Sequence, residues 1–354
     1  MNIAFDLRPI MSGNISGVET YTRSVLDELI KNDTENTYIL YTNSHANITE
    51  NLPKYKNAIY VNTKYPSKLF NIFLRLFKWP KLDKLIQKEC GKKVDIFFCP
   101  DPRPAPLKKA KKIIVVHDLC FKHFPEFFSK KSRIWFKYLL NFKRELKESK
   151  KIIAVSSYTK DDLVKTFEIN PDKISVIHEG GGEHLQRGEC TRSLPENYFL
   201  MLSTIEPRKN TNNAVKAFKK ANLKNVSLVI AGKKNEKIFS DYKLEEGDNV
   251  EYIGFVEESE KASLIKNAKG FVYLSLFEGF GLPATEAMYF QVPTLVSNTT
   301  SLKEIGEKYA LLADPEDIDD IAEKMKQLLH HKQIKPPYSW QKCGTNTLDV
   351  INYL

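Results

Sequence analysis

The sequence lacks the cysteine patterns of a disulfide-bonded or zinc-binding protein. Its 354 residues include five cysteines, an odd number, scattered along the chain without a C-x-x-C pair. A disulfide framework or a structural zinc site needs cysteines at recognisable, paired spacings. We therefore expect free thiols and a reducing, cytoplasmic environment.

The sequence also lacks long apolar runs and a basic, apolar leader. No run approaches the roughly 18 apolar residues that a membrane-spanning helix needs. The first residues, MNIAFDLRPI, alternate like a strand and do not resemble a signal peptide. The 42% of hydrophobic residues is nevertheless enough for ordinary protein cores.

Positive charge, in contrast, is in excess. Lys and Arg outnumber Asp and Glu by 54 to 44, which gives a net charge of +10. Nucleic acid, an anionic membrane and phosphorylated ligands are all compatible with this charge. Charge alone does not choose among them.

Strand-like and helix-like segments alternate along the chain. Strands are expected at 2–7, 37–41, 58–61, 96–99, 113–116, 152–155 and 174–177, and again at 198–202, 226–231, 250–253, 270–274, 294–296 and 310–312. Helices are expected at 18–30, 68–90, 130–147, 158–167, 211–221, 257–267, 315–329 and 339–353. Such alternation predicts doubly wound parallel sheets, and its restart after three consecutive glycines predicts two of them.

The stretch LFEGFGLPATEAM, residues 276–288, carries the strongest functional signal. Gly281 lets the backbone approach a ligand closely, and Pro283 suits the first turn of a helix. The N–H groups at such a helix start would face an anion. Glu278 and Glu286 can only accept hydrogen bonds when ionised, which suits sugar hydroxyls. An ordinary strand–helix turn with a capping carboxylate is the alternative, whereas phosphate and hydroxyls together describe a nucleotide sugar.

A second motif, EPRKN at 206–210, follows the first strand of the second half. Ligands of doubly wound sheets bind beyond the carboxyl ends of the strands. Arg208 and Lys209 at such a position would pair with a diphosphate, Arg through its planar fork and Lys as a point charge. A solvated helix start is the alternative.

The first half carries weaker signals. Its first strand leads into a glycine loop that includes Gly17 but no full G-x-G-x-x-G. The strand IIVVHDL ends at His117 and Asp118. A turn glycine and a structural histidine are the alternatives to a binding site.

These motifs resemble those of the retaining glycosyltransferases of family 4. EGFGLPATE is similar to that family's paired-glutamate motif, and EPRKN is similar to its phosphate-binding motif. VHDLCFKHFPEFFS resembles a subgroup that often transfers mannose or a related sugar in surface-polysaccharide assembly. The resemblance spans nearly the whole chain.

The resemblance implies the GT-B fold, in which two Rossmann-like α/β domains are joined and the last helix crosses back onto the first domain. Residues 1–182 would form the acceptor domain and 183–196 the linker. Residues 197–335 would bind the nucleotide sugar, and 336–354 would form the returning helix.

The resemblance also implies which residues bind the nucleotide. Arg208, Lys209 and the loop at Gly17 would hold the departing diphosphate. Glu286 would hold the ribose hydroxyls. Because basic residues would neutralise the diphosphate, we expect neither a metal ion nor another cofactor.

For the donor sugar, the resemblance implies contacts with His117, Asp118 and Glu278. The backbone N–H groups that would assist them are those of Phe280, Gly281 and Leu282. Asp317 and Asp319 spell the D-x-D metal motif of another glycosyltransferase fold. We interpret them as a helix start, because acidic residues there are favoured by the helix dipole.

The segment Lys68–Lys88 combines apolar and basic residues. The apolar residues recur at helical spacing and are Leu69, Ile72, Phe73, Leu76 and Phe77. A basic amphipathic helix of this kind would lie on an anionic membrane leaflet. A helix with one core face and solvated lysines is the alternative.

The predicted function is transfer of a hexose, with GDP-mannose as the first guess for the donor, to a glycan or lipid-linked acceptor. We expect no nucleic-acid partner and a location in the cytoplasm, at the inner face of the cell membrane if the basic helix binds there. A phosphorylase of this fold would need a far longer chain. A catalytically silent nucleotide- or RNA-binding protein would explain the charge without needing both motifs.

Overall fold

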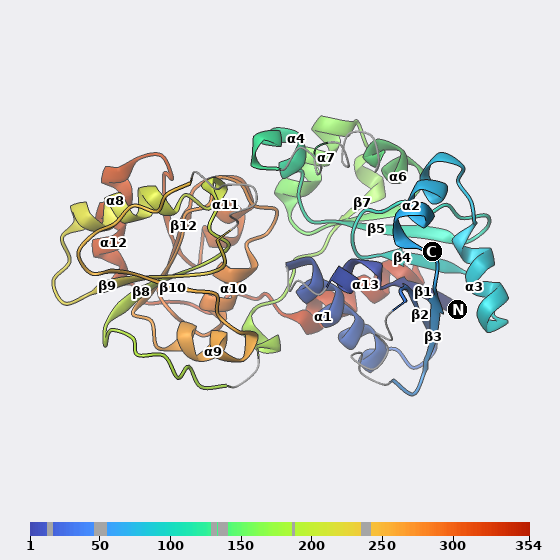
Figure 1. Cartoon of the computed structure of the whole chain (residues 1–354), viewed down its shortest axis with the longest axis horizontal. Coiled ribbons are helices and arrows are strands. Elements are labelled where there is room, and N and C mark those ends of the chain that lie inside the picture. The colour runs from blue at the N-terminus through green and yellow to red at the C-terminus, as the bar shows by residue number, and fades with distance from the viewer. Residues whose placement is uncertain (13–16, 46–54, 129–132, 134–140, 186–187, 235–241) are drawn as a thin grey trace. The chain divides into compact units, whose positions relative to one another are not determined.

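The computed structural model describes residues 1–12, 17–45, 55–128, 133, 141–185, 188–234 and 242–354 (Figure 1). The chain forms two compact units. Unit 1 comprises Met1–Leu119, Lys130–His178 and Trp340–Leu354, and unit 2 comprises Cys120–Ser129 and Glu179–Ser339. Among the described residues, no helix has both the length and the apolar character to cross a bilayer.

Unit 1 is built on a seven-stranded parallel sheet with the order β3-β2-β1-β4-β5-β6-β7. The strands are β1 (Asn2–Asp6), β2 (Thr37–Asn43), β3 (Ala58–Thr63), β4 (Ile96–Cys99), β5 (Lys111–Val116), β6 (Lys151–Ala154) and β7 (Ile174–Val176). The central strands are almost continuously buried, as expected for a parallel sheet covered on both faces. The helices are α1 (Gly17–Asn32), α2 (Ser67–Leu76), α3 (Leu82–Cys90), α6 (Phe142–Glu148), α7 (Ser157–Phe167) and α13 (Trp340–Asn352).

Unit 2 is built on a six-stranded parallel sheet with the order β10-β9-β8-β11-β12-β13. The strands are β8 (Tyr198–Leu202), β9 (Ser227–Ala231), β10 (Val250–Gly254), β11 (Gly270–Tyr273), β12 (Thr294–Ser297) and β13 (Leu311–Ala313). The helices are α4 (Cys120–His123), α8 (Thr211–Ala221), α9 (Glu258–Lys266), α10 (Leu282–Tyr289), α11 (Thr300–Gly306) and α12 (Ile318–Leu328). Apolar side chains of α8 and α12 share one core with those of β8 and β9.

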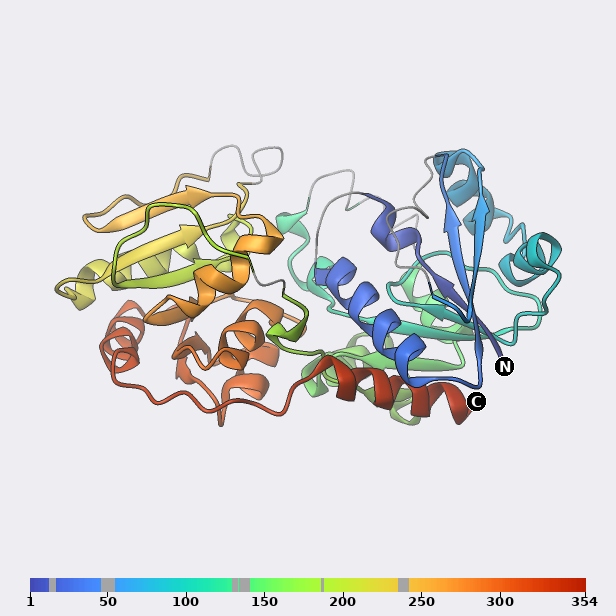
Figure 2. The same ribbon diagram turned by 90° about the horizontal axis from the view of Figure 1, so that it is seen from below.

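The predicted fold class is therefore confirmed. Each of the 13 expected strands is present within a few residues of its predicted position. The last helix, α13, also belongs to unit 1 as predicted, and it lies beside α1 (Figure 2). A Cβ on Gly344 would lie 2.5 Å from the Cβ of Glu28, so glycine permits this close approach.

The prediction of one helix over 68–90 is wrong. α2 ends at Leu76 and α3 begins only at Leu82. Pro80 lies between them, and a proline has no N–H to donate within a helix. Lys78 also adopts the left-handed conformation, with φ of 51°. Most of the helix predicted at 130–147 lies outside the described residues, apart from the α6 portion.

Replacing Gly344 by Val should destabilise the protein, because the added atoms overlap Glu28 and push α13 away from α1. Overpacking of this kind typically costs about 1–3 kcal/mol. Thr345→Val on the exposed side of α13 is the matched control and should change stability by less than about 0.5 kcal/mol. Urea unfolding of the three proteins measures the difference, and equal stabilities would contradict the packing of α13 on α1.

Candidate functional site

The candidate site of unit 2 lies where the strand order of its sheet reverses. β8 and β11 are neighbours at the centre of the sheet, although the chain makes β9 and β10 between them. The chain adds β9 and β10 on one side of this pair and β12 and β13 on the other. Loops after such neighbouring strands part to leave a crevice in which doubly wound proteins bind ligands. Here the two loops carry EPRKN and EGFGLPATE.

The two loops are joined by backbone and side-chain hydrogen bonds. The N–H of Leu276 donates to the carbonyl oxygen of Arg208 at 2.8 Å. Nη1 of Arg208 in turn donates to the carbonyl oxygen of Phe277 at 2.9 Å. Arg208 and Lys209 therefore have a fixed position relative to the loop of Glu278.

A short turn sets the direction of the two basic residues. Pro207–Lys209 forms a single 3-10 turn, and Asn210 then takes the left-handed conformation, with φ of 58°. Asparagine tolerates this conformation better than most residues. The Asn210 side chain donates to the carbonyl oxygen of Pro315 at 2.6 Å and anchors the start of α8.

Glu278, Lys209, Arg208 and Tyr273 form a buried polar cluster. Oε1 of Glu278 lies 2.5 Å from Nζ of Lys209 and 3.1 Å from Nη1 of Arg208. The Tyr273 hydroxyl donates to the same oxygen at 3.0 Å and accepts from Nζ of Lys209 at 2.7 Å. The structure thus brings together three residues for which the sequence predicted separate contacts with phosphate and sugar.

The cluster keeps Glu278 ionised. Burial alone would raise the pKa of this carboxyl, but Arg208 and Lys209 outweigh burial and lower the pKa to about 2. The pKa of Lys209 is lowered by its burial and by the adjacent Arg208, against the attraction of Glu278. Arg208 is also paired with Glu206, at 2.8 Å, so the cluster as a whole is close to neutral.

The loop between Glu278 and α10 has a conformation that requires glycine. Gly281 has φ of 108°, and a Cβ there would lie 2.5 Å from Cδ2 of Leu302. The hydroxyl of Ser301 donates to the carbonyl oxygens of Glu278 and Phe280 and holds the loop in place. The side chains of Phe280 and Leu282 are buried, so only their backbone can face a ligand.

Glu286 on α10 is paired with a histidine that the sequence analysis did not select. Nε2 of His184 lies 3.3 Å from Oε1 of Glu286. Nδ1 of His184 is bonded to the carbonyl oxygen of Gly181 at 3.0 Å, and it must carry a proton because a carbonyl only accepts. Burial disfavours the imidazolium, but the adjacent carboxylate of Glu286 outweighs burial, so the pKa of His184 is raised.

The three consecutive glycines explain how His184 reaches Glu286. A Cβ on Gly182 would lie 2.8 Å from the ring of Phe290 and 3.2 Å from the carbonyl oxygen of Glu286. The hydroxyl of Thr285 donates to the carbonyl oxygen of Gly180 at 3.0 Å. The glycines thus pack directly on α10, and the following histidine meets the carboxylate. The run GGGEH is the sequence signal that could have indicated this contact.

The candidate residues of unit 1 lie just after the carboxyl end of β5 and at the start of α1. Nε2 of His117 is bonded to the carbonyl oxygen of Pro100 at 2.8 Å, and its ring packs edge-on against Tyr21. Asp118 is half-buried beside it. Gly17 is exposed, and a Cβ there would meet nothing within 4 Å. The rest of the glycine loop, 13–16, lies outside the described residues.

The segment after His117 and Asp118 belongs to unit 2. The rings of His123 and Phe124 lie 5.5 and 5.6 Å from that of Phe277, the neighbour of Glu278. The motif VHDLCFKHFPEFFS therefore supports the loop of Glu278 through its aromatic residues. No local pattern in the sequence indicated this packing, because the two segments are far apart along the chain.

Asp317 lies at the start of α12 as its N-cap residue, as interpreted from the sequence. Its carboxylate accepts from the N–H groups of Asp319 and Asp320, at 2.8 and 3.1 Å, and so caps the helix. Asp319 forms an ion pair with Lys220. Within the described ranges, no group of three or more His, Cys, Asp or Glu side chains is arranged to hold a metal ion.

Two family models match the chain, one in each half. Residues 15–180 match the model described as Glycosyltransferase Family 4. Residues 186–346 match the model described as Glycosyl transferases group 1. Together the two matches leave unmatched only the first 14 residues, residues 181–185 and the last eight residues.

Curated relatives cover most of the chain as well. The O-antigen chain mannosyltransferase B of Escherichia coli is 26% identical over 276 residues, which are 70% of this chain and 72% of that protein. The O-antigen chain mannosyltransferase RfbU of Salmonella typhimurium is 29% identical over 262 residues, 72% of this chain and 70% of that protein.

Solved structures share the fold. Anabaena HepE in complex with UDP and glucose superposes with a TM-score of 0.63 at 15% identity, with 100% of both chains covered. WaaG, a glycosyltransferase involved in lipopolysaccharide biosynthesis, superposes with a TM-score of 0.61 at 13% identity, with 98% of this chain and 95% of that chain covered. At these identities the likeness concerns the fold, which is the predicted GT-B fold. With both halves matched by family models and mannosyltransferases among its relatives, the chain belongs to glycosyltransferase family 4.

Proposed function

We propose that the protein transfers a hexose from a nucleoside-diphosphate sugar to a growing cell-surface polysaccharide. The named relatives are O-antigen mannosyltransferases, which supports mannose as the sugar and GDP-mannose as the first donor to test. The acceptor would be a glycan or a lipid-linked glycan, at the inner face of the cell membrane. The observation that carries the proposal is the buried cluster of Arg208, Lys209 and Glu278 in the loops after β8 and β11, where the strand order reverses.

The site contains groups that suit both the diphosphate and the sugar of a nucleotide sugar. Arg208 and Lys209 would stabilise the charge that develops on the departing diphosphate, with donors already fixed in position. Glu278 is ionised at neutral pH, so it can accept hydrogen bonds from sugar hydroxyls. Glu286, oriented by His184, would accept hydrogen bonds from the ribose.

A retaining mechanism by same-face attack fits this arrangement. The carboxylate of Glu278 is bonded to two cations and a tyrosine, which makes it a poor covalent nucleophile. In same-face attack the leaving phosphate takes the proton of the acceptor hydroxyl, so the protein need not supply a base. On the family resemblance, His117, Asp118 and Gly17 would also contact the donor.

The test is a panel of nucleotide sugars and free nucleotides measured by thermal shift. A ligand that binds only the folded protein stabilises it by RT ln(1 + [L]/Kd). We expect GDP-mannose to raise the unfolding temperature. In a separate hydrolysis assay without acceptor, we expect slow breakdown of the donor. Binding of RNA with no shift for any nucleotide sugar would instead support the silent RNA-binding alternative.

The two glutamates should affect different kinetic constants. The ribose does not change during the reaction, so Glu286→Gln should raise KM for the donor with little change in kcat. A hydrogen bond to a charged acceptor contributes about 1.5–3 kcal/mol, which corresponds to a ten- to hundredfold rise. Glu278→Gln removes charge next to the sugar ring, where positive charge grows, so kcat should fall.

Steady-state kinetics with varied donor and saturating acceptor measures both effects. Unfolding curves for each variant are needed, because Glu278→Gln leaves Lys209 without its anionic partner. Loss of turnover in Glu286→Gln together with loss of affinity alone in Glu278→Gln would reverse the two assignments.

The activity should survive excess EDTA, because Arg208 and Lys209 would neutralise the diphosphate without a metal ion. Asp317→Ala removes the cap of α12 and should cost about 1 kcal/mol of stability while turnover stays unchanged. Activity that EDTA abolishes and Mg²⁺ or Mn²⁺ restores would show that a metal ion is needed to neutralise the diphosphate.

The pair of His184 and Glu286 should make stability depend on pH. The pKa of His184 is raised above its ordinary value of 6.5 in the folded state. Its stabilising effect is therefore full below about pH 6.5 and is lost as the pH rises through the raised value. Urea unfolding across this range should show that the advantage of wild type over His184→Gln shrinks with rising pH.

His330→Gln, at an exposed position near the end of α12, is the control for the histidine substitution. Its effect on stability should show no comparable trend. An advantage of wild type over His184→Gln that stays constant or grows with pH would contradict the ion pair.

A further inference from the structure

The apolar residues of α2 lie on two faces, and only one of them is packed. Phe70 and Leu74 are 5% and 0% exposed and attach the helix to unit 1. The residues that the sequence singled out are on the open side. Leu69, Ile72, Phe73, Leu76 and Phe77 are 57%, 39%, 41%, 62% and 65% exposed. α2 therefore has a core face, as in the alternative reading of this helix, but that face consists of Phe70 and Leu74 and not of the five residues that the sequence singled out.

Trp79, which is 63% exposed, continues this run of exposed apolar side chains. The ring of Phe73 lies 5.2 Å from that of Phe77 and 6.3 Å from that of Trp79. We call these six residues the α2 patch. Seven of the 13 exposed large hydrophobic side chains found among the described residues fall between Tyr65 and Trp79. Exposed apolar side chains concentrated in this way mark an interaction surface, whereas singly scattered ones need no explanation.

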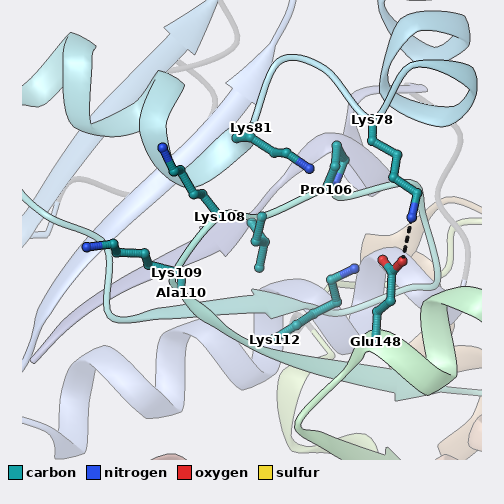
Figure 3. A pocket seen from close by; sticks show the side chains of 9 residues that line it. Lys78, Lys81, Pro106, Lys108, Lys109, Ala110, Lys112 and Glu148 are labelled. Atoms are coloured by element: carbon teal, nitrogen blue, oxygen red, sulfur yellow. Dashed lines mark hydrogen bonds and ion pairs between the residues drawn. The ribbon is translucent and has the colours of Figure 1, made fainter.

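A cationic pocket adjoins the α2 patch along the chain. A cavity of about 290 Å³ is lined by Lys78, Lys81, Lys108, Lys109 and Lys112, with Glu148 as its one acidic side chain (Figure 3). We call it the lysine pocket. Along the connection from α2 to α3, Phe77 and Trp79 belong to the patch, whereas Lys78 and Lys81 belong to the pocket.

Only part of the positive charge in the lysine pocket is neutralised. Lys112 is paired with the buried Glu145 at 2.7 Å, and Lys78 is paired with Glu148 at 3.0 Å. The remaining three lysines make no ion pair with any residue that the structure describes; they are Lys81, Lys108 and Lys109. An anion in the pocket would supply the missing negative charge.

The backbone of the lysine pocket is held in place without using these ammonium groups. The carboxylate of Asp83 on α3 accepts from the N–H groups of Lys108, Lys109 and Ala110 at 2.9, 2.7 and 3.2 Å. Burial alone would raise the pKa of Asp83, but these hydrogen bonds outweigh it and lower the pKa. The loop therefore presents its lysines from a rigid support.

We propose that the α2 patch and the lysine pocket together form a docking surface for a membrane that contains anionic phospholipid. The apolar side chains of the patch enter the boundary between headgroups and acyl chains, where tryptophan is also favoured. The lysines beside them bind the phosphates of anionic headgroups. An acidic protein surface would match the lysines but would leave six large apolar side chains to be covered, and the combination favours a lipid leaflet.

The test is co-sedimentation of the full chain with vesicles of phosphatidylcholine alone or mixed with phosphatidylglycerol. Binding should require phosphatidylglycerol and weaken with salt, because exposed charges are screened within about 8 Å at physiological ionic strength. Lys81→Glu with Lys108→Glu should lower the partition coefficient by about thirtyfold or more. Leu76→Ser should lower it by about tenfold, through loss of apolar burial.

Matched variants on unit 2 separate a specific surface from net charge. Lys224→Glu with Lys269→Glu changes the charge equally at exposed positions, and Ile334→Ser removes a side chain that is 60% exposed, close to the 62% of Leu76. Both controls should bind vesicles like wild type. Equal losses in the test and control variants, or equal recovery with neutral and anionic vesicles, would overturn the proposal.

A second copy of the chain is the other possible occupant of the patch. A dimer in solution that Leu76→Ser dissociates, without vesicle binding by wild type, would also overturn the membrane proposal. The measurement needs no nucleotide sugar, so its outcome is independent of the proposed catalytic function.

Discussion

The ion cluster of Glu278 with Arg208 and Lys209 is the interaction on which the rest of the candidate site depends. Charged groups that are removed from water cost several kcal/mol each unless they are paired and hydrogen-bonded. Here one carboxylate oxygen accepts hydrogen bonds from Lys209 and from the Tyr273 hydroxyl and forms an ion pair with Arg208, so the burial is compensated. Because the partners come from the loops after β8 and β11, the cluster also fixes these loops relative to each other.

The second half of the site is organised around α10. Close packing of Gly182 on this helix brings His184 to Glu286, and the positive-φ turn at Gly281 sets where the helix begins. Both glutamates of the paired motif thus have a basic partner in the structure. A nucleotide sugar would meet carboxylates that are already held in position by their partners, which reduces the reorganisation needed on binding.

The sequence predicted the strands well because the central ones are short apolar runs buried on both faces of a parallel sheet, and this burial leaves a clear pattern. It also identified the two loops of the site, since their motifs are local in sequence. It missed the break at Pro80, where spaced apolar residues on either side suggested one continuous helix. It also missed His184, because the contact with Glu286 joins segments about a hundred residues apart and no local spacing reveals it.

The most direct measurement of the central claim uses a variant in which the cluster is neutralised while the fold is kept. Lys209→Met combined with Glu278→Gln removes one charge of each sign, and replacing a buried ion pair by neutral groups is often tolerated. The dissociation constant of GDP-mannose, measured by calorimetry on wild type and on this double variant, is the decisive quantity. The account predicts a folded variant with at least tenfold weaker donor binding, and wild-type affinity in a folded variant would contradict it.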